Sequence, residues 1–234
     1  MRAFLFALLA LTVPALAADQ AAAPAAAGVV TSVSGKVSVY PAGAAQAQEL
    51  KLASPLHAGD RITTGANGKA VLVLSDGTRL NVNYNTDITL RDKSAAGKAS
   101  ARGIASIKIA LGELWAKVTK KDSQLEFDTP AAVAAVKGTE PGFIVGDGPS
   151  ASTCIYLLSG AMKLSNASGS ADMTPLTQAC LGKGVTLSQT LVVKWDGKTN
   201  KPADLNGTAT GAEVNIQFQG ADGKPKTLDL HYGK

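Results

Sequence analysis

Few residues in this chain have the chemistry that catalysis requires. The sequence has two histidines, His57 and His231, and neither lies in a catalytic or metal-binding pattern. A Gly-x-Ser-x-Gly elbow, a phosphate-binding loop and a His-Glu-x-x-His pair are all missing from it. A lone histidine is more often structural or solvated than catalytic. We therefore predict a protein that is not an enzyme, with no catalytic residue and no cofactor. An enzyme with an unrecognised site is the least favoured alternative.

The two cysteines, Cys154 and Cys180, predict a disulfide. Both lie in or beside strand-like runs, and neighbouring strands would bring their Cα atoms within the roughly 4.4–6.8 Å that a bridge needs. An exported chain favours the oxidised pair, which loop entropy makes worth about 3 kcal/mol. Two buried free thiols are the alternative. With only two cysteines and two distant histidines, we predict no metal site.

The start of the chain has the features of a Sec signal peptide. Arg2 is followed by a short apolar run and then by Ala15-Leu16-Ala17, an A-x-A cleavage site. We predict cleavage after Ala17, with an uncleaved membrane anchor as the alternative. No later stretch approaches the roughly 20 apolar residues of a span, so we expect no membrane crossing after cleavage.

Composition and turn spacing predict an all-β fold. Aromatic residues make up only 5% of the chain and glycines number 24, which suits many short strands and tight turns. We expect a short-stranded β-sandwich or a β-solenoid-like domain, followed by a C-terminal β-hairpin. The net charge of +5 is mild and the lysines are scattered, so we predict no nucleic-acid partner. The predicted segments are a signal peptide (1–17), a flexible N-terminus (18–27), the β domain (28–193), a linker (194–211) and the hairpin (212–234).

Three short motifs predict turns within the β domain. Gly59-Asp60 should form a turn, because glycine accepts positive φ and aspartate caps its own turn. Residues 66–69, Ala-Asn-Gly-Lys, predict a hairpin. Asp76-Gly77 lies between two alternating runs and favours a type I′ turn.

The stretch from Leu125 to Phe143 is central to the interpretation. Pro130 fixes its own φ and pushes Thr129 towards extended geometry. The alanine-rich run that follows could be helical, since alanine is the best helix former. It is short and lies between two strand-like segments, so we favour extended structure.

Together these motifs resemble the FecR domain, a bacterial periplasmic all-β module. The resemblance covers about residues 28–190. It departs from the family where Lys137 replaces the usual arginine, and where residues 140–142 separate Gly138-Thr139 from Phe143. The signature residues that carry it are Gly59, Asp60, Asp76, Gly77, Gly112, Trp115, Thr129, Pro130, Lys137, Gly138 and Thr139.

The resemblance implies a non-enzymatic binding or scaffold module, periplasmic or secreted, that recognises an envelope or periplasmic protein. Some family members are sigma-factor regulators with a cytoplasmic anti-sigma segment and a membrane helix before the domain. We identify neither in this sequence, so we expect no direct signalling to a cytoplasmic sigma factor. Recognition would use an exposed strand edge that adds to a strand of the partner.

The alternative function is binding of the cell wall, with peptidoglycan or another polysaccharide as the partner. Exposed aromatic side chains would then serve as stacking platforms, and the candidates are Trp115, Trp195 and Tyr84. For Trp115 we favour packing on the sheet over exposure, because large aromatic side chains usually bury most of their area.

Overall fold

The computed structural model describes residues 26–92, 104–120, 125–147 and 152–200, and the backbone of 214–219 and 225–230. The predicted signal peptide (1–17) lies outside these ranges. The described part is built from strands, with one turn of 3-10 helix, η2 (Gln189–Leu191). The all-β prediction is confirmed. The strands of the main sheet are β1 (Gly28–Ser34), β2 (Val37–Tyr40), β3 (Gln48–Glu49), β4 (Pro55–Leu56), β5 (Arg61–Thr64), β6 (Lys69–Leu74), β7 (Arg79–Val82), β8 (Asp87–Asp92), β9 (Ile104–Lys117), β10 (Leu125–Asp128), β11 (Val133–Val145), β12 (Ser152–Asn166), β13 (Gly169–Met173), β14 (Thr177–Gly182) and β15 (Val192–Lys194).

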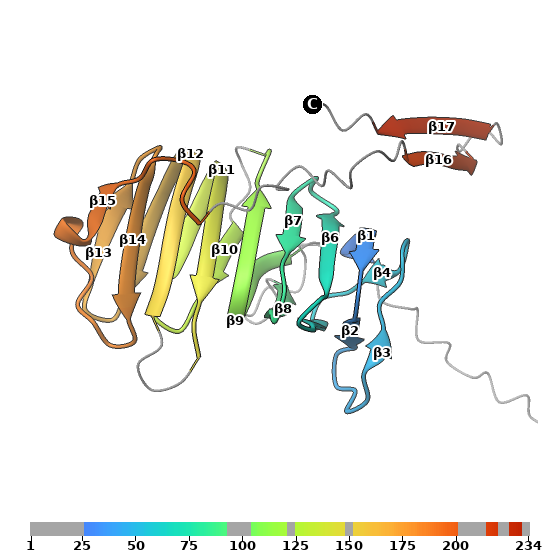
Figure 1. Cartoon of the computed structure of the whole chain (residues 1–234), viewed down its shortest axis with the longest axis horizontal. Helices are drawn as coiled ribbons and strands as arrows, with labels where there is room; N and C mark the ends of the chain where they lie inside the picture. The colour runs from blue at the N-terminus through green and yellow to red at the C-terminus, as the bar shows by residue number, and fades with distance from the viewer. Residues whose placement is uncertain are drawn as a thin grey trace, which may run out of the picture.

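The main sheet is folded into two layers, which Figure 1 shows one behind the other. The first layer runs β4-β1-β6-β7 and continues through β9, β11, β12, β14 and β15. The second runs β3-β2-β5-β8 and continues through β9, β10, β11, β12 and β13. Strands β9, β11 and β12 belong to both layers, because each passes from one layer to the other.

Glycine makes these crossings possible. Gly112 divides β9 into a part that pairs with β8 and a part that pairs with β7 and β11. Its φ is 95°, and a Cβ there would lie 2.4 Å from the Cα of Thr86. Only glycine adopts this conformation without strain. The expected short strands are therefore wrong for β9, β11 and β12, which span 14, 13 and 15 residues, because their glycines bend the backbone without ending the strand.

The hydrophobic core fills the space between the layers. Strand β6 shows the alternation that builds it, since Ala70, Leu72 and Leu74 are buried and the residues between them are half-buried. Phe127 of the second layer stacks on Phe143 of the first, with ring centroids 4.7 Å apart. All five side chains belong to one cluster that spans both layers.

Two of the predicted turns differ from the structure. Residues 66–69 do not form a hairpin, because β5 pairs with β2 and β8 while β6 pairs with β1 and β7. This turn carries the chain between the layers. Asp76 and Gly77 do connect the paired strands β6 and β7, but only Gly77 has a positive φ, so the turn is not type I′. The Asp76 carboxylate instead accepts hydrogen bonds from the backbone N–H and the hydroxyl of Thr78.

The central stretch is extended, as expected. Strand β10 ends at Asp128, a tight turn follows, and β11 runs from Val133 to Val145. Pro141 lies inside β11, which pairs with β9 and with β12. Proline has no backbone N–H to donate, so it would break a regular ladder of hydrogen bonds at this position. The register of β11 against β12 shifts on both sides of Glu140, so a β-bulge accommodates the proline. Residues 140–142 therefore kink the strand without interrupting it.

The C-terminal part begins differently from the prediction. Residues 195–200, expected to start a linker, pack on the first layer, and Trp195 is only 6% exposed. Further along, β16 (Val214–Gln219) and β17 (Pro225–Leu230) pair antiparallel, with Val214 opposite Leu230. They form a separate two-stranded sheet and pair with no other described strand.

Candidate functional site

Most signature residues form the turns of the fold. Gly59 has a φ of 90°, and the buried Asp60 carboxylate accepts a 2.8 Å hydrogen bond from the backbone N–H of His57. Thr129 closes the turn between β10 and β11, since its hydroxyl accepts the N–H of Ala132 and donates to the carbonyl of the same residue. These side chains are used within the fold, which argues against a role in binding.

The rest of the signature forms bends and packing contacts. Gly138 bends β11 with a φ of 56°, and Gly112 bends β9. Thr139 is buried, and its carbonyl accepts the N–H of Val118. Trp115 is buried on the outer face of the first layer.

Lys137 is the exception among the charged signature residues. Its side chain is exposed on the outer face of the second layer, and it forms no hydrogen bond or ion pair with a described residue. The other two, Asp60 and Asp76, each accept hydrogen bonds within their turns. Lys137 is therefore free to contact a partner.

Lys137 lines an open groove of about 610 Å³ on that outer face. Strands β10, β11, β12 and β13 form the floor, and they lie side by side in this order. The groove is hollowed at two exposed alanines, Ala135 on β11 and Ala161 on β12. Their side chains are shorter than the outward-facing side chains around them. A groove of this size is in the range of ligand sites, roughly 300–1,000 Å³.

The charges around the two alanines form an ordered pattern. On β11 and β12, Ala135 lies opposite Lys163, and Lys137 lies opposite Ala161, so the two lysines are diagonal neighbours. Glu126 on β10 lies opposite Ala135. Asp172 on β13 lies opposite Lys163. Across the four strands the order is acid, base, base, acid. None of these four side chains forms an ion pair with a described residue.

An aromatic cluster occupies the outer face of the first layer. Trp115, Tyr156 and Trp195 pack together there, with ring centroids 5.1–6.0 Å apart. Gly142 on β11 pairs with Trp115 on one side and with Tyr156 on the other. A Cβ at Gly142 would lie 2.5 Å from the Trp115 ring, so the indole lies directly on the glycine backbone. Glycine is required at this position because of that ring.

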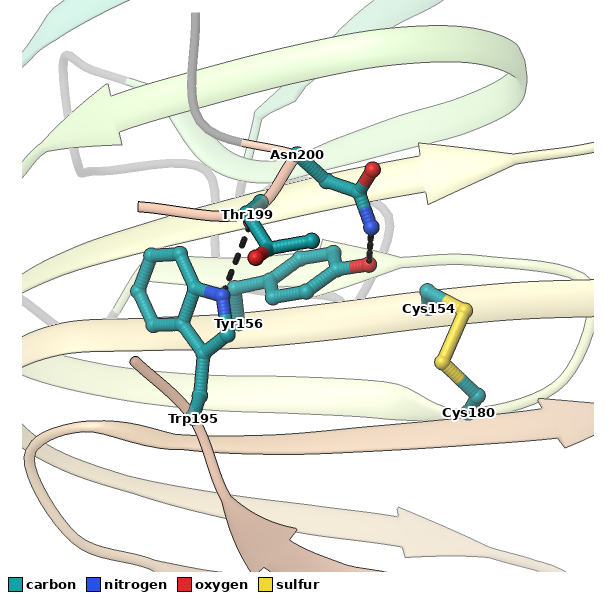
Figure 2. The surroundings of a disulfide bond; sticks show 6 residues. All are labelled: Cys154, Tyr156, Cys180, Trp195, Thr199 and Asn200. Carbon is teal, nitrogen blue, oxygen red and sulfur yellow. Dashed lines mark hydrogen bonds between the residues drawn. A yellow bond between two sulfur atoms is a disulfide. The ribbon is translucent and has the colours of Figure 1, made fainter. Parts of the chain in front are cut away.

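Residues 195–200 form a strap over this cluster. Figure 2 shows Trp195 Nε1 donating to the carbonyl of Thr199, and Asn200 Nδ2 donating to the Tyr156 hydroxyl, both at 2.8 Å. Asp196 organises the turn of the strap. The Thr199 hydroxyl lowers the pKa of this carboxyl below its usual range, and the backbone N–H groups of Lys198 and Thr199 add to the effect.

This packing corrects the prediction of aromatic stacking platforms. Trp115 and Trp195 are 2% and 6% exposed, so neither ring is available to a sugar. Tyr84 is 45% exposed, and the Lys69 ammonium lies 4.5 Å from the centre of its ring. Of the three candidates only Tyr84 is accessible, and one isolated ring is a weak platform.

The predicted disulfide is present. Cys154 on β12 and Cys180 on β14 lie directly opposite each other and are bonded. Figure 2 shows the bridge beside Tyr156, and Cys154 also packs against the aromatic cluster. The bridge ties the middle of the main sheet to its C-terminal end.

The edges of the main sheet offer little room for a partner strand. Strands β3 and β4 have two residues each, and β4 begins with Pro55. At β13 the side-chain amide of Gln189 accepts the N–H of Asp172 and donates to its carbonyl, both at 2.9 Å, in the place of a neighbouring strand. The remaining end is the three-residue β15, where Val193 is 49% exposed.

Residues with catalytic or metal chemistry do not converge in the described part of the chain. The His57 ring is 3.8 Å from the Asp60 carboxylate, but this pair is at a turn and does not line the groove. His231 lies outside the described residues. Within the described ranges no cluster of three or more histidine, cysteine or acidic side chains could hold a metal ion. The same ranges contain no helix with the length and apolar character of a membrane span.

Sequence reasoning did not identify the groove. Ala135 and Ala161 look unremarkable in sequence, and Lys163 and Asp172 belong to no motif. Their proximity depends on the pairing of β10 to β13. Alternation on β11 does place Ala135 and Lys137 on one face, which was the only available signal.

A comparison with protein families gives a match to the central part of the chain. Residues 60–163 match the FecR protein family. The matched FecR region contains ten of the eleven signature residues, the exception being Gly59, and it includes Lys137 and Lys163 of the groove. The resemblance is thereby confirmed for this segment. Asp172 and the strap lie beyond it. A comparison with curated proteins gives no match.

Solved structures give distant similarity. Two crystal structures of a protein from Parabacteroides distasonis, proposed to be an anti-sigma factor, share 15% and 14% sequence identity with this chain. The TM-scores are 0.48 and 0.47, and the alignments cover 58% of this chain and 60% of the other. The aligned part is thus less than two thirds of that protein.

Proposed function

We propose that this chain is a non-enzymatic binding module of the FecR type that recognises an envelope protein through the outer groove. The observation that carries the proposal is the placement of Lys137. It is the charged signature side chain that the fold does not use, and it lines the groove together with Lys163. A concave surface with a few placed polar groups is the usual form of a binding site.

A location outside the cytoplasm fits the disulfide. Bridges such as Cys154–Cys180 persist in oxidising compartments and are rare in the cytosol. The predicted signal peptide of residues 1–17 is consistent with export. The proposed compartment is the periplasm or the cell exterior.

Two other modes of recognition have less support. Within the main sheet, strand addition is limited to the short edge of β15, since the other ends are two residues long or are bonded to Gln189 at Asp172. For polysaccharide stacking, Tyr84 is the one accessible ring among the three candidates, since both tryptophans are buried. The groove is larger than either feature and contains unpaired charges.

The test is capture from periplasmic and envelope extract by the immobilised, oxidised chain. The groove variant is Lys137→Ala with Lys163→Ala. Its matched control, Lys36→Ala with Lys183→Ala, removes two exposed lysines outside the groove. We expect the wild type and the control to retain the same envelope protein at moderate salt, and the groove variant to lose most of it.

Equal capture by the groove variant would exclude the groove. Purified peptidoglycan forms a separate arm of the experiment. Retention on peptidoglycan, with no protein captured, would favour the polysaccharide alternative. An equal loss of captured protein in the groove variant and in the control variant would mean that only net charge matters, because both remove two positive charges.

A further inference from the structure

The charge order across the groove suggests the kind of chain that would fill it. Glu126 on β10 and Asp172 on β13 stand at its two ends, and Lys137 and Lys163 stand between them on β11 and β12. All four are exposed and lack an ion-pair partner among the described residues. The complementary ligand is basic at both ends and acidic in the middle.

The spacing of these charges fits an extended peptide that lies across the strands. Three inter-strand steps separate β10 from β13, which is about 14–15 Å at the usual 4.7–4.9 Å per step. In an extended chain, residues i and i+4 point to the same side and lie about 13–14 Å apart. The two distances agree to within about 1 Å.

The middle of the groove fits residue i+2 of such a peptide. This residue would stand over the boundary between β11 and β12, where Lys137 and Lys163 are diagonal neighbours. Diagonal neighbours on a sheet are about 7–8 Å apart, so a single carboxylate can approach both ammonium groups. Ala135 and Ala161 occupy the other two positions beside these lysines, and their short side chains leave room for the peptide backbone.

We infer that the groove binds an extended peptide segment of the pattern basic-x-acidic-x-basic, laid across β10 to β13. The inference rests on the proposed function, because it names the part of the partner that the groove would recognise. Basic residues would pair with Glu126 and Asp172, and the acidic residue would pair with Lys137 and Lys163. The alternating x residues would point to solvent.

The test is an amide NMR titration of the purified chain with short blocked peptides. The probe is Gly-Lys-Ala-Glu-Ala-Lys-Gly. One control, Gly-Lys-Lys-Ala-Ala-Glu-Gly, has the same composition in a different order. The second control, Gly-Glu-Ala-Lys-Ala-Glu-Gly, inverts the charges. We expect saturable shifts at the amides of Ala135 and Ala161 with the probe, and affinity at least fivefold lower for both controls.

A matched pair of variants tests the contact itself. Lys163→Glu reverses one groove charge, and Lys183→Glu makes the same change in net charge at a turn outside the groove. An exposed ion pair contributes about 0.2–1 kcal/mol, or roughly 1.4–5-fold in affinity. Replacing attraction by a repulsion of similar size should therefore weaken probe binding by about 2–25-fold for Lys163→Glu. For Lys183→Glu we expect less than a twofold change.

Equal affinity for the probe and the reordered peptide would overturn the inference, and so would shifts that avoid the groove. No saturable binding at millimolar peptide would also overturn it. None of these results decides the proposed function, which the capture experiment tests separately. Loss of envelope-protein capture in the Lys137 and Lys163 variant would still support the groove, with a partner of a different pattern.

Discussion

Replacing Gly142 by alanine should destabilise the protein, because the Trp115 ring lies on its backbone. The new Cβ would be 2.5 Å from two ring carbons of Trp115 and 2.6 Å from a third, so the ring or the strand must move. Forcing an extra methyl into a packed site typically costs about 1–3 kcal/mol. Alanine also restricts the unfolded chain, which offsets about 0.4–1 kcal/mol of that cost.

Gly182→Ala is the matched control. Gly182 is also in a strand, and neither glycine has a positive φ. A Cβ at Gly182 would meet its nearest atom, Cγ2 of Val185, at an ordinary 3.5 Å. Both substitutions reduce the conformational entropy of the unfolded chain to the same extent. The difference between their free energies of unfolding therefore reports the clash alone. We expect Gly142→Ala to be about 1–3 kcal/mol less stable than Gly182→Ala.

Urea unfolding followed by tryptophan fluorescence is the assay. Both tryptophans of the chain lie in the aromatic cluster, so the signal reports on this site. With an m-value of about 2 kcal/mol/M, the two midpoints should differ by about 0.5–1.5 M urea. Coincident midpoints would refute the packing of Trp115 on Gly142. In a Trp115→Leu background the difference should disappear, because the double-mutant cycle removes the ring that causes it.

Three further predictions concern the same domain. Replacing both Cys154 and Cys180 by serine should lower the free energy of unfolding by about 3 kcal/mol, measured in urea against the oxidised wild type. Gln189→Ala should expose the β13 edge at Asp172 and increase self-association in analytical ultracentrifugation, whereas an unchanged sedimentation profile would mean that the amide does not protect the edge. The pKa of Asp196 is lowered in the folded state, so its contribution to stability is present above the unfolded pKa of about 3.9 and is lost as pH falls through the lower folded pKa. Tryptophan fluorescence of the strap should therefore change in that acidic range, and an identical titration of Asp196→Ala would contradict this assignment.

Local sequence determined where turns lie and which fold class the chain has. Gly59-Asp60 and Thr129-Pro130 form turns because glycine conformation, proline geometry and side-chain hydrogen bonds act within a few residues. The alternation of Ala70 to Leu74 gave a strand with one buried face, since the period of a strand is two. The cysteine pair was predictable because the predicted export favours oxidation and both residues lie in strand-like runs.

Strand pairing, in contrast, was not visible in local sequence. The turn at residues 66–69 has the composition of a hairpin, but its flanking strands pair elsewhere, because the sheet folds into two layers at that point. Trp195 follows the last strand of the main sheet in a polar stretch, and only the contact with Trp115 and Tyr156 makes it a buried residue.

The amino-acid sequence by itself determined an all-β chain with FecR-type turns, because those features depend on short-range geometry. It also indicated a disulfide, because the chain has only two cysteines and a predicted signal peptide. The tertiary structure alone decided where the charges meet. Glu126, Lys137, Lys163 and Asp172 are up to 46 positions apart in the chain, yet the pairing of β10 to β13 places them on one outer face. That pairing is set by the burial of the opposite face of each strand in the core, and not by the exposed residues themselves.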